Sequence, residues 1–248
     1  MSRRTLRAAG ALALFLSLVP VGAWAGRPLE TEDTGTVEPG RAELELSGDY
    51  ARNPTDNSWF AKGVLSVGVL PGLETRIEST VLLLEPEGER ARAGVGDSLF
   101  GVKYRLVDET DAVPALLGAF TVRLPTGDPE RGLGTEDADV GLLAVASKAF
   151  GPVTLTGNVG YTFVTRERDL DFWTLAASIE GRMSRAWTLV GEAVSAVGAH
   201  SAVRTVVLRV GSIYAITDRV KLDGAVGFGV TRESPDVVIT VGVTIGLF

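Results

Sequence analysis

From residue 41 onward, apolar and polar side chains alternate along the chain with a period of two residues. The first such run covers residues 41–50, and Leu44 and Leu46 fall on one of its faces. Glu43 and Glu45 fall on the other face. Strict alternation of this kind is typical of a β-strand with one apolar and one polar side. The pattern therefore predicts an all-β chain, without the 3.6-residue period of amphipathic helices.

The alternation recurs in twelve runs. They are predicted at 41–50, 58–70, 75–87, 96–107, 113–124, 138–149, 152–163, 171–182, 186–197, 203–216, 220–231 and 236–248. Most have the ~9–11 residues that a tilted strand needs to cross a bilayer, whereas strands of soluble proteins more often have ~5–6. Residues 41–248 are thus expected to form a closed antiparallel transmembrane β-barrel with an up-and-down meander. Closure leaves no strand edge without hydrogen-bond partners in lipid.

The connections between these runs alternate in length. Those at 71–73, 150–152 and 216–219 are tight. The longer, more polar connections are 51–57, 85–95, 125–137, 164–170, 198–202 and 232–235. Outer-membrane barrels have short turns on the periplasmic side and longer loops outside. With an even strand count, both mature termini are expected in the periplasm.

Aromatic residues give a second indication of a membrane. After the first 25 residues, every Trp and Tyr falls on the apolar face of a predicted strand and near a strand end. An aromatic girdle is therefore predicted from Tyr50, Trp59, Tyr104, Tyr161, Trp173, Trp187 and Tyr214. Such rings prefer the interface between water and lipid, where the ring is buried and its polar atom stays wet.

The opposite face of the strands is charged and is expected to line a narrow lumen, with Glu45, Lys103, Arg105, Glu192 and Arg209 near mid-height. The predicted pore-lining residues are Glu43, Glu45, Glu78, Asp97, Lys103, Arg105, Arg123, Asp139, Glu180, Glu192, Arg209 and Asp223. Mixed signs let these groups pair across strands. Symmetric closure of the hairpins predicts three pairs of directly opposed residues. These are Glu192 with Arg209, Trp187 with Tyr214, and Asp97 with Arg123.

The start of the chain reads as an export signal. Residues 1–25 contain three Arg, an apolar run of 12 residues and an Ala-Trp-Ala end, as in a secretory signal peptide. An uncleaved anchor is the alternative, but that run is short for the ~20 residues of a spanning helix. Residues 26–40 then form a periplasmic N-terminal segment that could fold into the lumen. The expected location is the cell outer membrane, with outer-membrane lipid and the barrel-assembly machinery as partners.

Composition excludes several classes of function. The chain has no Cys, so it has no disulfide, thiolate metal site, cysteine nucleophile or lipidated cysteine. Removal of residues 1–25 leaves 21 Lys and Arg against 31 Asp and Glu, a net charge of −10. Because phosphate binding needs a basic face, nucleic acid is not expected as a partner.

Several motifs resemble an outer-membrane family named for the MetA-pathway of phenol degradation. They are Glu32-Asp33-Thr34-Gly35-Thr36, Gly101-Val102-Lys103-Tyr104-Arg105, Leu124-Pro125-Thr126-Gly127-Asp128, Asp139-Val140-Gly141, Gly157-Asn158-Val159-Gly160-Tyr161 and Thr217-Asp218-Arg219. The resemblance covers nearly the whole mature chain and implies an outer-membrane barrel that passively transports small, hydrophobic or aromatic compounds. One feature departs from such barrels. Phe248 shares parity with Gly246 and Thr244, whereas a terminal aromatic residue usually faces lipid.

The sequence gives little indication of a catalytic site. His200 is the only histidine, and it lies beside Ser201 in a predicted external loop. A Ser–His pair needs hydrogen-bond geometry and a third orienting group, which two adjacent loop residues rarely achieve. Glu43 and Glu45 resemble an acid/base pair or a cation site, but charge balance with nearby cations explains them more simply. No catalytic residue, cofactor or metal is therefore predicted.

Three classes of function stay open at this stage. A passive channel or transporter for small molecules fits a charged lumen within twelve strands. A non-conducting structural or surface-interaction barrel would have its lumen closed by side-chain pairs or by residues 26–40. A hydrolase on a barrel scaffold is third. Conductance in a planar bilayer separates the first class from the second.

Overall fold

The computed structural model describes residues 27–53 and 56–248, so the expected signal peptide lies outside the described residues. The strands are β1 (Ala42–Arg52), β2 (Asp56–Leu70), β3 (Leu73–Pro86), β4 (Arg92–Val95), β5 (Ser98–Val107), β6 (Ala115–Leu124), β7 (Asp139–Phe150), β8 (Val153–Phe163), β9 (Phe172–Arg182), β10 (Trp187–Gly198), β11 (Arg204–Ala215), β12 (Val220–Gly229) and β13 (Val237–Gly246). A 3-10 turn, η1 (Arg168–Leu170), precedes β9. Within the described ranges, no helix is long and apolar enough to cross a membrane.

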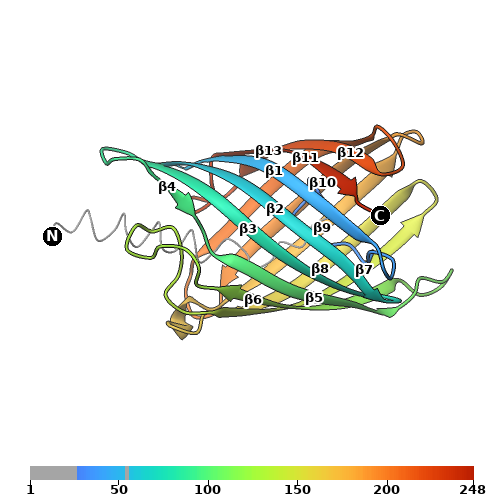
Figure 1. Ribbon diagram of the computed structural model, residues 1–248, viewed down its shortest axis with the longest axis horizontal. Helices are drawn as coiled ribbons and strands as arrows, with labels where there is room; N and C mark the ends of the chain where they lie inside the picture. The colour runs from blue at the N-terminus through green and yellow to red at the C-terminus, as the bar shows by residue number, and fades with distance from the viewer. Residues whose placement is uncertain (1–26, 54–55) are drawn as a thin grey trace.

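The sheet closes on itself as an antiparallel barrel (Figure 1). Except for β4 and β5, each strand pairs with its neighbours in sequence, and β1 pairs with β13 from Glu43 opposite Gly246 to Arg52 opposite Val237. The predicted pairing of the first and last strands is therefore confirmed. β4 and β5 both pair with β3 and share one position in the wall, so the described strands form a twelve-stranded up-and-down barrel.

Burial along each strand follows the alternation of the sequence. In β10, Val190, Glu192 and Val194 are buried, whereas Leu189 is 42% exposed. The polar set therefore points into the barrel, and the apolar set forms the outer surface. In water this arrangement would be inverted, but in a bilayer lipid covers the apolar surface.

The two ends of the barrel differ. In Figure 1 the C-terminus and the short turns lie at the right-hand end, and β4 with the longer connections lies at the left-hand end. The turn between β2 and β3 is Pro71-Gly72, and Gly72 has a φ of 75°. This left-handed backbone conformation is easily adopted only by glycine, so a two-residue turn is possible here.

The predicted strand 96–107 is wrong in detail. The strand β5 begins only at Ser98, because Asp97 leaves the ladder and its carboxylate accepts the backbone N–H groups of Gly127 at 2.9 Å and Thr135 at 2.8 Å. The predicted loop 85–95 is also wrong in part, because Arg92–Val95 forms the short strand β4, which pairs with β3. Asp97 thus anchors the long connection between β6 and β7. It is not part of a regular strand wall.

The predicted pairing of Asp97 with Arg123 is also wrong. Leu99 lies opposite Arg123, and the register shifts between Arg105 and Val107. The pairs from Ser98–Leu124 to Arg105–Leu117 centre the β5–β6 hairpin on residue 111, whereas Asp97 opposite Arg123 would centre it on residue 110, and this difference of one residue moves the pairing by two. Arg123 instead lies opposite Asp139 on β7, with 3.9 Å between the charged groups.

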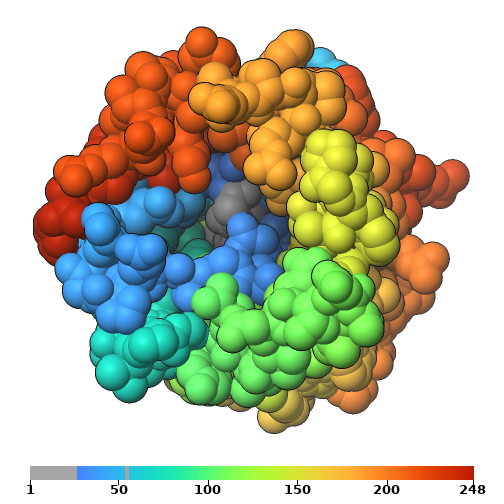
Figure 2. All heavy atoms as spheres, turned by 90° about the vertical axis from the view of Figure 1, so that its right-hand side faces the viewer, coloured from blue at the N-terminus to red at the C-terminus, as the bar shows by residue number. Residues whose placement is uncertain are grey.

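The segment before β1 lies inside the barrel. Figure 2 looks along the barrel from the end that carries the C-terminus, and blue atoms of early residues lie within the ring of strands. Pro39 forms a parallel bridge to Gly68, and the segment continues inward from there. A Cβ at Gly68 would collide with the backbone carbonyl of Glu38, so glycine is needed for this close approach. The segment of residues 27–38 is called the lumen segment below.

Candidate functional site

Glu32 of the lumen segment meets two cations of the barrel wall. Its carboxylate lies 2.9 Å from Lys103 Nζ on β5 and 3.4 Å from an Arg76 guanidinium nitrogen on β3. Glu74 contacts the same cations, at 3.2 Å from Arg76 and 3.6 Å from Lys103. All four side chains are almost completely buried. Two cations and two carboxylates therefore balance one another in the interior.

Backbone hydrogen bonds fix the segment on both sides of this cluster. The Glu32 N–H donates to the Asn158 side-chain oxygen at 2.7 Å, and the Asn158 amide donates to the Glu32 carbonyl at 2.8 Å. Further along, the Val37 N–H donates to Glu74 at 2.8 Å. Polar side chains of β3 and β8 thus satisfy backbone groups that no strand pairs with.

A second cluster surrounds Glu192. Its carboxylate accepts the Glu30 N–H at 2.9 Å, the Thr31 N–H at 2.8 Å and the Thr31 hydroxyl at 2.7 Å. Arg209 donates to the same carboxylate at 2.6 Å and to the Glu30 carboxylate at 2.6 Å. Glu192 and Arg209 are directly opposed across β10 and β11, which confirms that predicted pair. On the outer face of the same hairpin, the predicted pair of Trp187 and Tyr214 is also confirmed.

Arg27 anchors the described start of the lumen segment. Its guanidinium lies 3.0 Å from Asp223 on β12 and donates to the Thr240 hydroxyl on β13 at 2.8 Å. The guanidinium passes directly over Gly242, where a Cβ would collide with it. The lumen segment is therefore held from three sides of the barrel.

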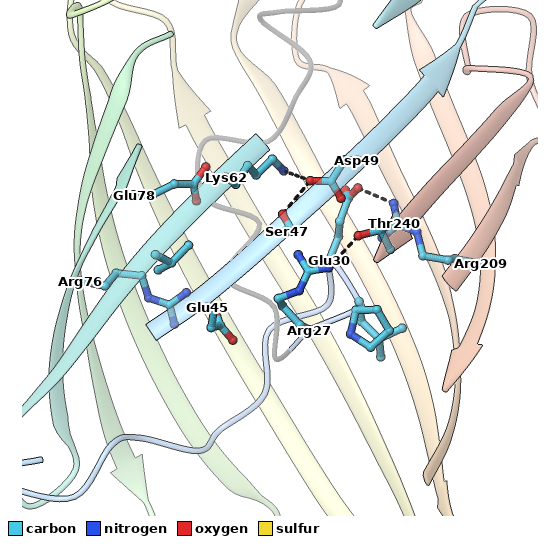
Figure 3. Close-up of a pocket in the computed structure, with 13 residues that line it drawn as sticks. Arg27, Glu30, Glu45, Ser47, Asp49, Lys62, Arg76, Glu78, Arg209 and Thr240 are labelled. Carbon is cyan, nitrogen blue, oxygen red and sulfur yellow. Dashed lines mark hydrogen bonds and ion pairs between the residues drawn. The ribbon is translucent and has the colours of Figure 1, made fainter. Parts of the chain in front are cut away.

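Two adjoining cavities run between the lumen segment and the wall. The inner cavity has a volume of about 70 Å³ and is lined by the residues labelled in Figure 3, among them Arg27, Glu45 and Arg76. The outer cavity, of about 140 Å³, extends towards the end with the longer loops. The two share the lining residues Glu30, Asp49, Lys62, Arg209 and Thr240. The walls of the outer cavity are otherwise largely apolar and include Phe60, Val194, Ala196, Val207 and Val238.

The charged groups at the junction of the cavities are themselves paired. Figure 3 shows Lys62 next to Asp49 and Arg209 next to Glu30. The Lys62 ammonium lies 3.9 Å from Asp49, which also accepts the Ser47 hydroxyl at 2.9 Å. The longer separation at Lys62 leaves this ammonium the less tightly engaged of the two cations. The junction is thus a narrow, polar constriction beneath an apolar outer cavity.

The structure divides the predicted pore-lining residues into three groups. Buried inside the barrel are Glu45, Lys103, Arg123, Asp139, Glu192 and Arg209. Partly buried on the inward face of their strands are Glu43, Glu78, Glu180 and Asp223. Asp97 lies outside the strands, in the loop contact described above, and Arg105 lies near the end of β5, where it pairs with Asp108. The expectation of Arg105 near mid-height is therefore wrong, because β5 ends two residues later.

Sequence reasoning missed the partners that the lumen segment supplies. Glu30 and Glu32 lie in no strand, so no alternation marks them as inward-facing. Glu74 and Asn158 do follow the inward parity of β3 and β8, and this signal was available. The alternation along each strand does not indicate which of the inward-facing groups contacts the lumen segment.

The predicted aromatic residues lie on the outer surface near strand ends. Tyr50 packs on Trp59 with ring centroids 4.5 Å apart, and Tyr161 packs on Trp173 at 4.7 Å. Trp59, Tyr104, Trp173, Trp187 and Tyr214 are each about half exposed. Phe248 lies two residues beyond the end of β13 and is 65% exposed.

Asp171 organises the loop between β8 and β9. Its carboxylate accepts the Val164 N–H at 2.7 Å, the Tyr161 hydroxyl at 2.9 Å and Arg168 at 2.9 Å. Burial disfavours the charged form, but these three donors outweigh it and hold the pKa of Asp171 below its ordinary value. The loop is therefore tied to an ionised carboxylate.

The predicted external histidine has no catalytic surroundings. His200 is exposed in the turn between β10 and β11, and no described side chain hydrogen-bonds to it. Among the described residues, no group of three or more histidines and carboxylates is placed to hold a metal ion.

Comparison with known proteins adds a family and a set of similar folds. The family model described as "Putative MetA-pathway of phenol degradation" matches residues 25–246. Among curated proteins, none matches the chain at the level of sequence. An outer-membrane channel from Pseudomonas putida F1 has a similar solved structure, with a TM-score of 0.67 and 14% identity over 87% of this chain and 98% of that one.

Two porins are also similar in fold. The NanC porin has a TM-score of 0.61 and 11% identity over 82% of this chain and 100% of its own. The KdgM porin has a TM-score of 0.58 and 12% identity over 83% of this chain and 99% of its own. At these identities the likeness extends to the fold alone, which is that of barrels in the outer membrane.

Proposed function

The chain belongs to the family described as "Putative MetA-pathway of phenol degradation", and from this premise we propose that it is a passive outer-membrane channel for small, compact solutes. The observation that carries the proposal is the pair of adjoining cavities beside the lumen segment. They extend from the end with the longer loops into the charged interior. The similar folds of an outer-membrane channel and two porins support the same function.

The dimensions and walls of the cavities favour apolar solutes of the size of one aromatic ring. An engineered apolar cavity of about 150 Å³ binds benzene, and the outer cavity has about 140 Å³. Sugars and peptides need more room than this. The family description, with its reference to phenol, is consistent with an aromatic solute.

The channel is proposed to sit in the bilayer with its apolar outer face against outer-membrane lipid. The half-exposed Trp and Tyr residues near the strand ends would lie at the two interfaces. The short turns and both mature termini would then be periplasmic, after removal of a signal peptide and insertion by the barrel-assembly machinery. We propose no enzymatic activity for this chain.

Planar-bilayer conductance and solute uptake into vesicles test the proposal. Purified protein in vesicles should show small ion conductance and should admit phenol-sized solutes faster than hexose-sized ones. Deletion of residues 27–38 should raise the conductance several-fold, because this segment crosses the interior between the wall groups Lys103 and Glu192.

A non-conducting structural barrel is the second candidate. It is favoured by the number of contacts that hold the lumen segment across the interior, at Arg76, Lys103, Asn158, Glu192 and Asp223. If intact protein shows neither conductance nor solute uptake, and the deletion variant shows conductance, the segment is a permanent seal. The channel proposal would then be rejected.

A further inference from the structure

The contacts of Glu32 have the form of a ligand in a binding site. A single carboxylate is held by an ammonium at 2.9 Å and a guanidinium at 3.4 Å, and its surroundings are almost completely buried. We propose that Arg76 and Lys103 form a carboxylate-binding site in the lumen, which Glu32 occupies here and which an aromatic or similarly compact carboxylate solute takes over during transport. The inference rests on the proposed channel function and names the class of solute.

The charges of the barrel wall support this assignment. Arg76 and Lys103 share Glu74, so the three wall groups together carry one net positive charge, and Glu32 neutralises it. The cluster at Arg209 is different. There the wall supplies Glu192 at 2.6 Å, so Arg209 and Glu192 balance each other before Glu30 is added. Of the two clusters, only the one at Glu32 has more cations than carboxylates among the wall groups that are in direct ion pairs.

The anchoring of the segment allows Glu32 to leave. No strand of the barrel pairs with residues 30–37, which are held through side chains of the wall. The segment can therefore withdraw without breaking the hydrogen bonds between strands. A free carboxylate would form the same charge-assisted bonds to Lys103 and Arg76 that Glu32 forms.

A solute in the cavities would meet this site on its way. Arg76 lines the inner cavity, and the inner cavity adjoins the outer one through Lys62 and Arg209. An apolar ring fits the outer cavity, whereas a carboxylate needs a cation. The two features together select a compact apolar body with one carboxylate.

Benzoate binding to purified, folded protein in detergent tests the site, with benzamide as the neutral control. Glu32→Ala removes the internal carboxylate, and this variant should bind benzoate about tenfold more tightly than the wild type, as expected for one charge-assisted contact. Glu30→Ala is the matched control and should show no such gain, because Glu192 still neutralises Arg209. Adding Lys103→Met to Glu32→Ala should abolish the gain.

A second measurement leaves the site intact. The chain has no Cys, so Thr34→Cys introduces a single thiol at a buried position of the segment. Benzoate should speed its reaction with a maleimide, and benzamide should not. If Glu32→Ala binds benzoate no better than Glu30→Ala, or if benzoate leaves the labelling rate unchanged, the site is rejected.

Solute uptake separates this inference from the channel proposal. Uptake without any preference for benzoate over benzamide leaves the channel and rejects the carboxylate site. Benzoate binding to Glu32→Ala without uptake by the intact protein keeps the site and rejects the channel.

Discussion

Glu192 is the wall residue on which the docking of the lumen segment depends most directly. It accepts two backbone N–H groups and one hydroxyl from Glu30 and Thr31, in addition to the bond from Arg209. Replacement by Ala removes all of these acceptor positions at once. While the segment is docked, Arg209 keeps its contact with the Glu30 carboxylate at 2.6 Å, so the docked variant leaves Arg209 with a partner.

The size of the effect follows from the number of bonds lost. Hydrogen bonds to a charged group each contribute about 1.5–3 kcal/mol. Water that enters the lumen can accept hydrogen bonds from the three donors of the segment, which recovers part of this free energy. A net loss of about 3 kcal/mol is therefore expected, which shifts the balance between docked and released segment roughly 150-fold.

Two assays measure this shift. In the Thr34→Cys background, Glu192→Ala should raise the maleimide labelling rate of the single thiol towards that of the unfolded protein. In planar bilayers the same variant should show longer or more frequent open events. Glu180→Ala is the control, because Glu180 is an inward-facing carboxylate on β9 to which no described residue of the segment donates a hydrogen bond. If labelling and conductance change equally in the two variants, or in neither, the docking role assigned to Glu192 is wrong.

Three further predictions concern charge, pH and lipid. Arg209→Glu should shift the bilayer reversal potential towards cation selectivity much more than Arg105→Glu, because Arg209 lines both cavities and Arg105 lies near a strand end; equal shifts would contradict this. The folded-state pKa of Asp171 lies below its ordinary value of 3.8, so its stabilisation of the β8–β9 loop is present above that value and lost as the pH falls through the folded-state pKa. Protease cleavage of this loop should therefore accelerate in acid, and Asp171→Asn should cleave fast at neutral pH as well. Ala177→Arg, on the outer face of β9, should lower the free energy of unfolding in vesicles by about 2–4 kcal/mol, and Met183→Arg, beyond the strand end, by about 0–1 kcal/mol; denaturant titration would show a reversed order if the outer face were not in lipid.

The outer face of the barrel could be predicted because its cause is local. A strand in lipid must show apolar groups to the outside at every second residue, so parity alone identified the inward-facing Glu192 and Arg209. The same penalty fixes the register, since a slip by one residue would turn Arg209 into lipid at about 2–4 kcal/mol. Symmetric closure of a tight hairpin then placed these two residues opposite each other.

Prediction failed where the pairing depended on a loop. The β5–β6 hairpin has a register shift between Arg105 and Val107, and Asp97 binds the backbone of a loop some 30 residues later in sequence. Neither feature has a periodic signature. Counting from the turn placed the centre of this hairpin at residue 110, whereas the observed pairs place it at residue 111, so Leu99 and not Asp97 lies opposite Arg123.

The sequence by itself determined the closed barrel, the faces of its strands and the pairing of its first and last strands, because the bilayer imposes one repeating rule on every strand. Only the tertiary structure decided what lies in the lumen. Residues 27–38 follow no period, and their positions depend on single contacts between groups far apart in the chain, such as Glu32 with Lys103 and Thr31 with Glu192. A charge that is inward-facing can pair with any of several partners across the interior. The choice of partner depends on distances in the folded structure, and the pattern of residues along the sequence does not specify these distances.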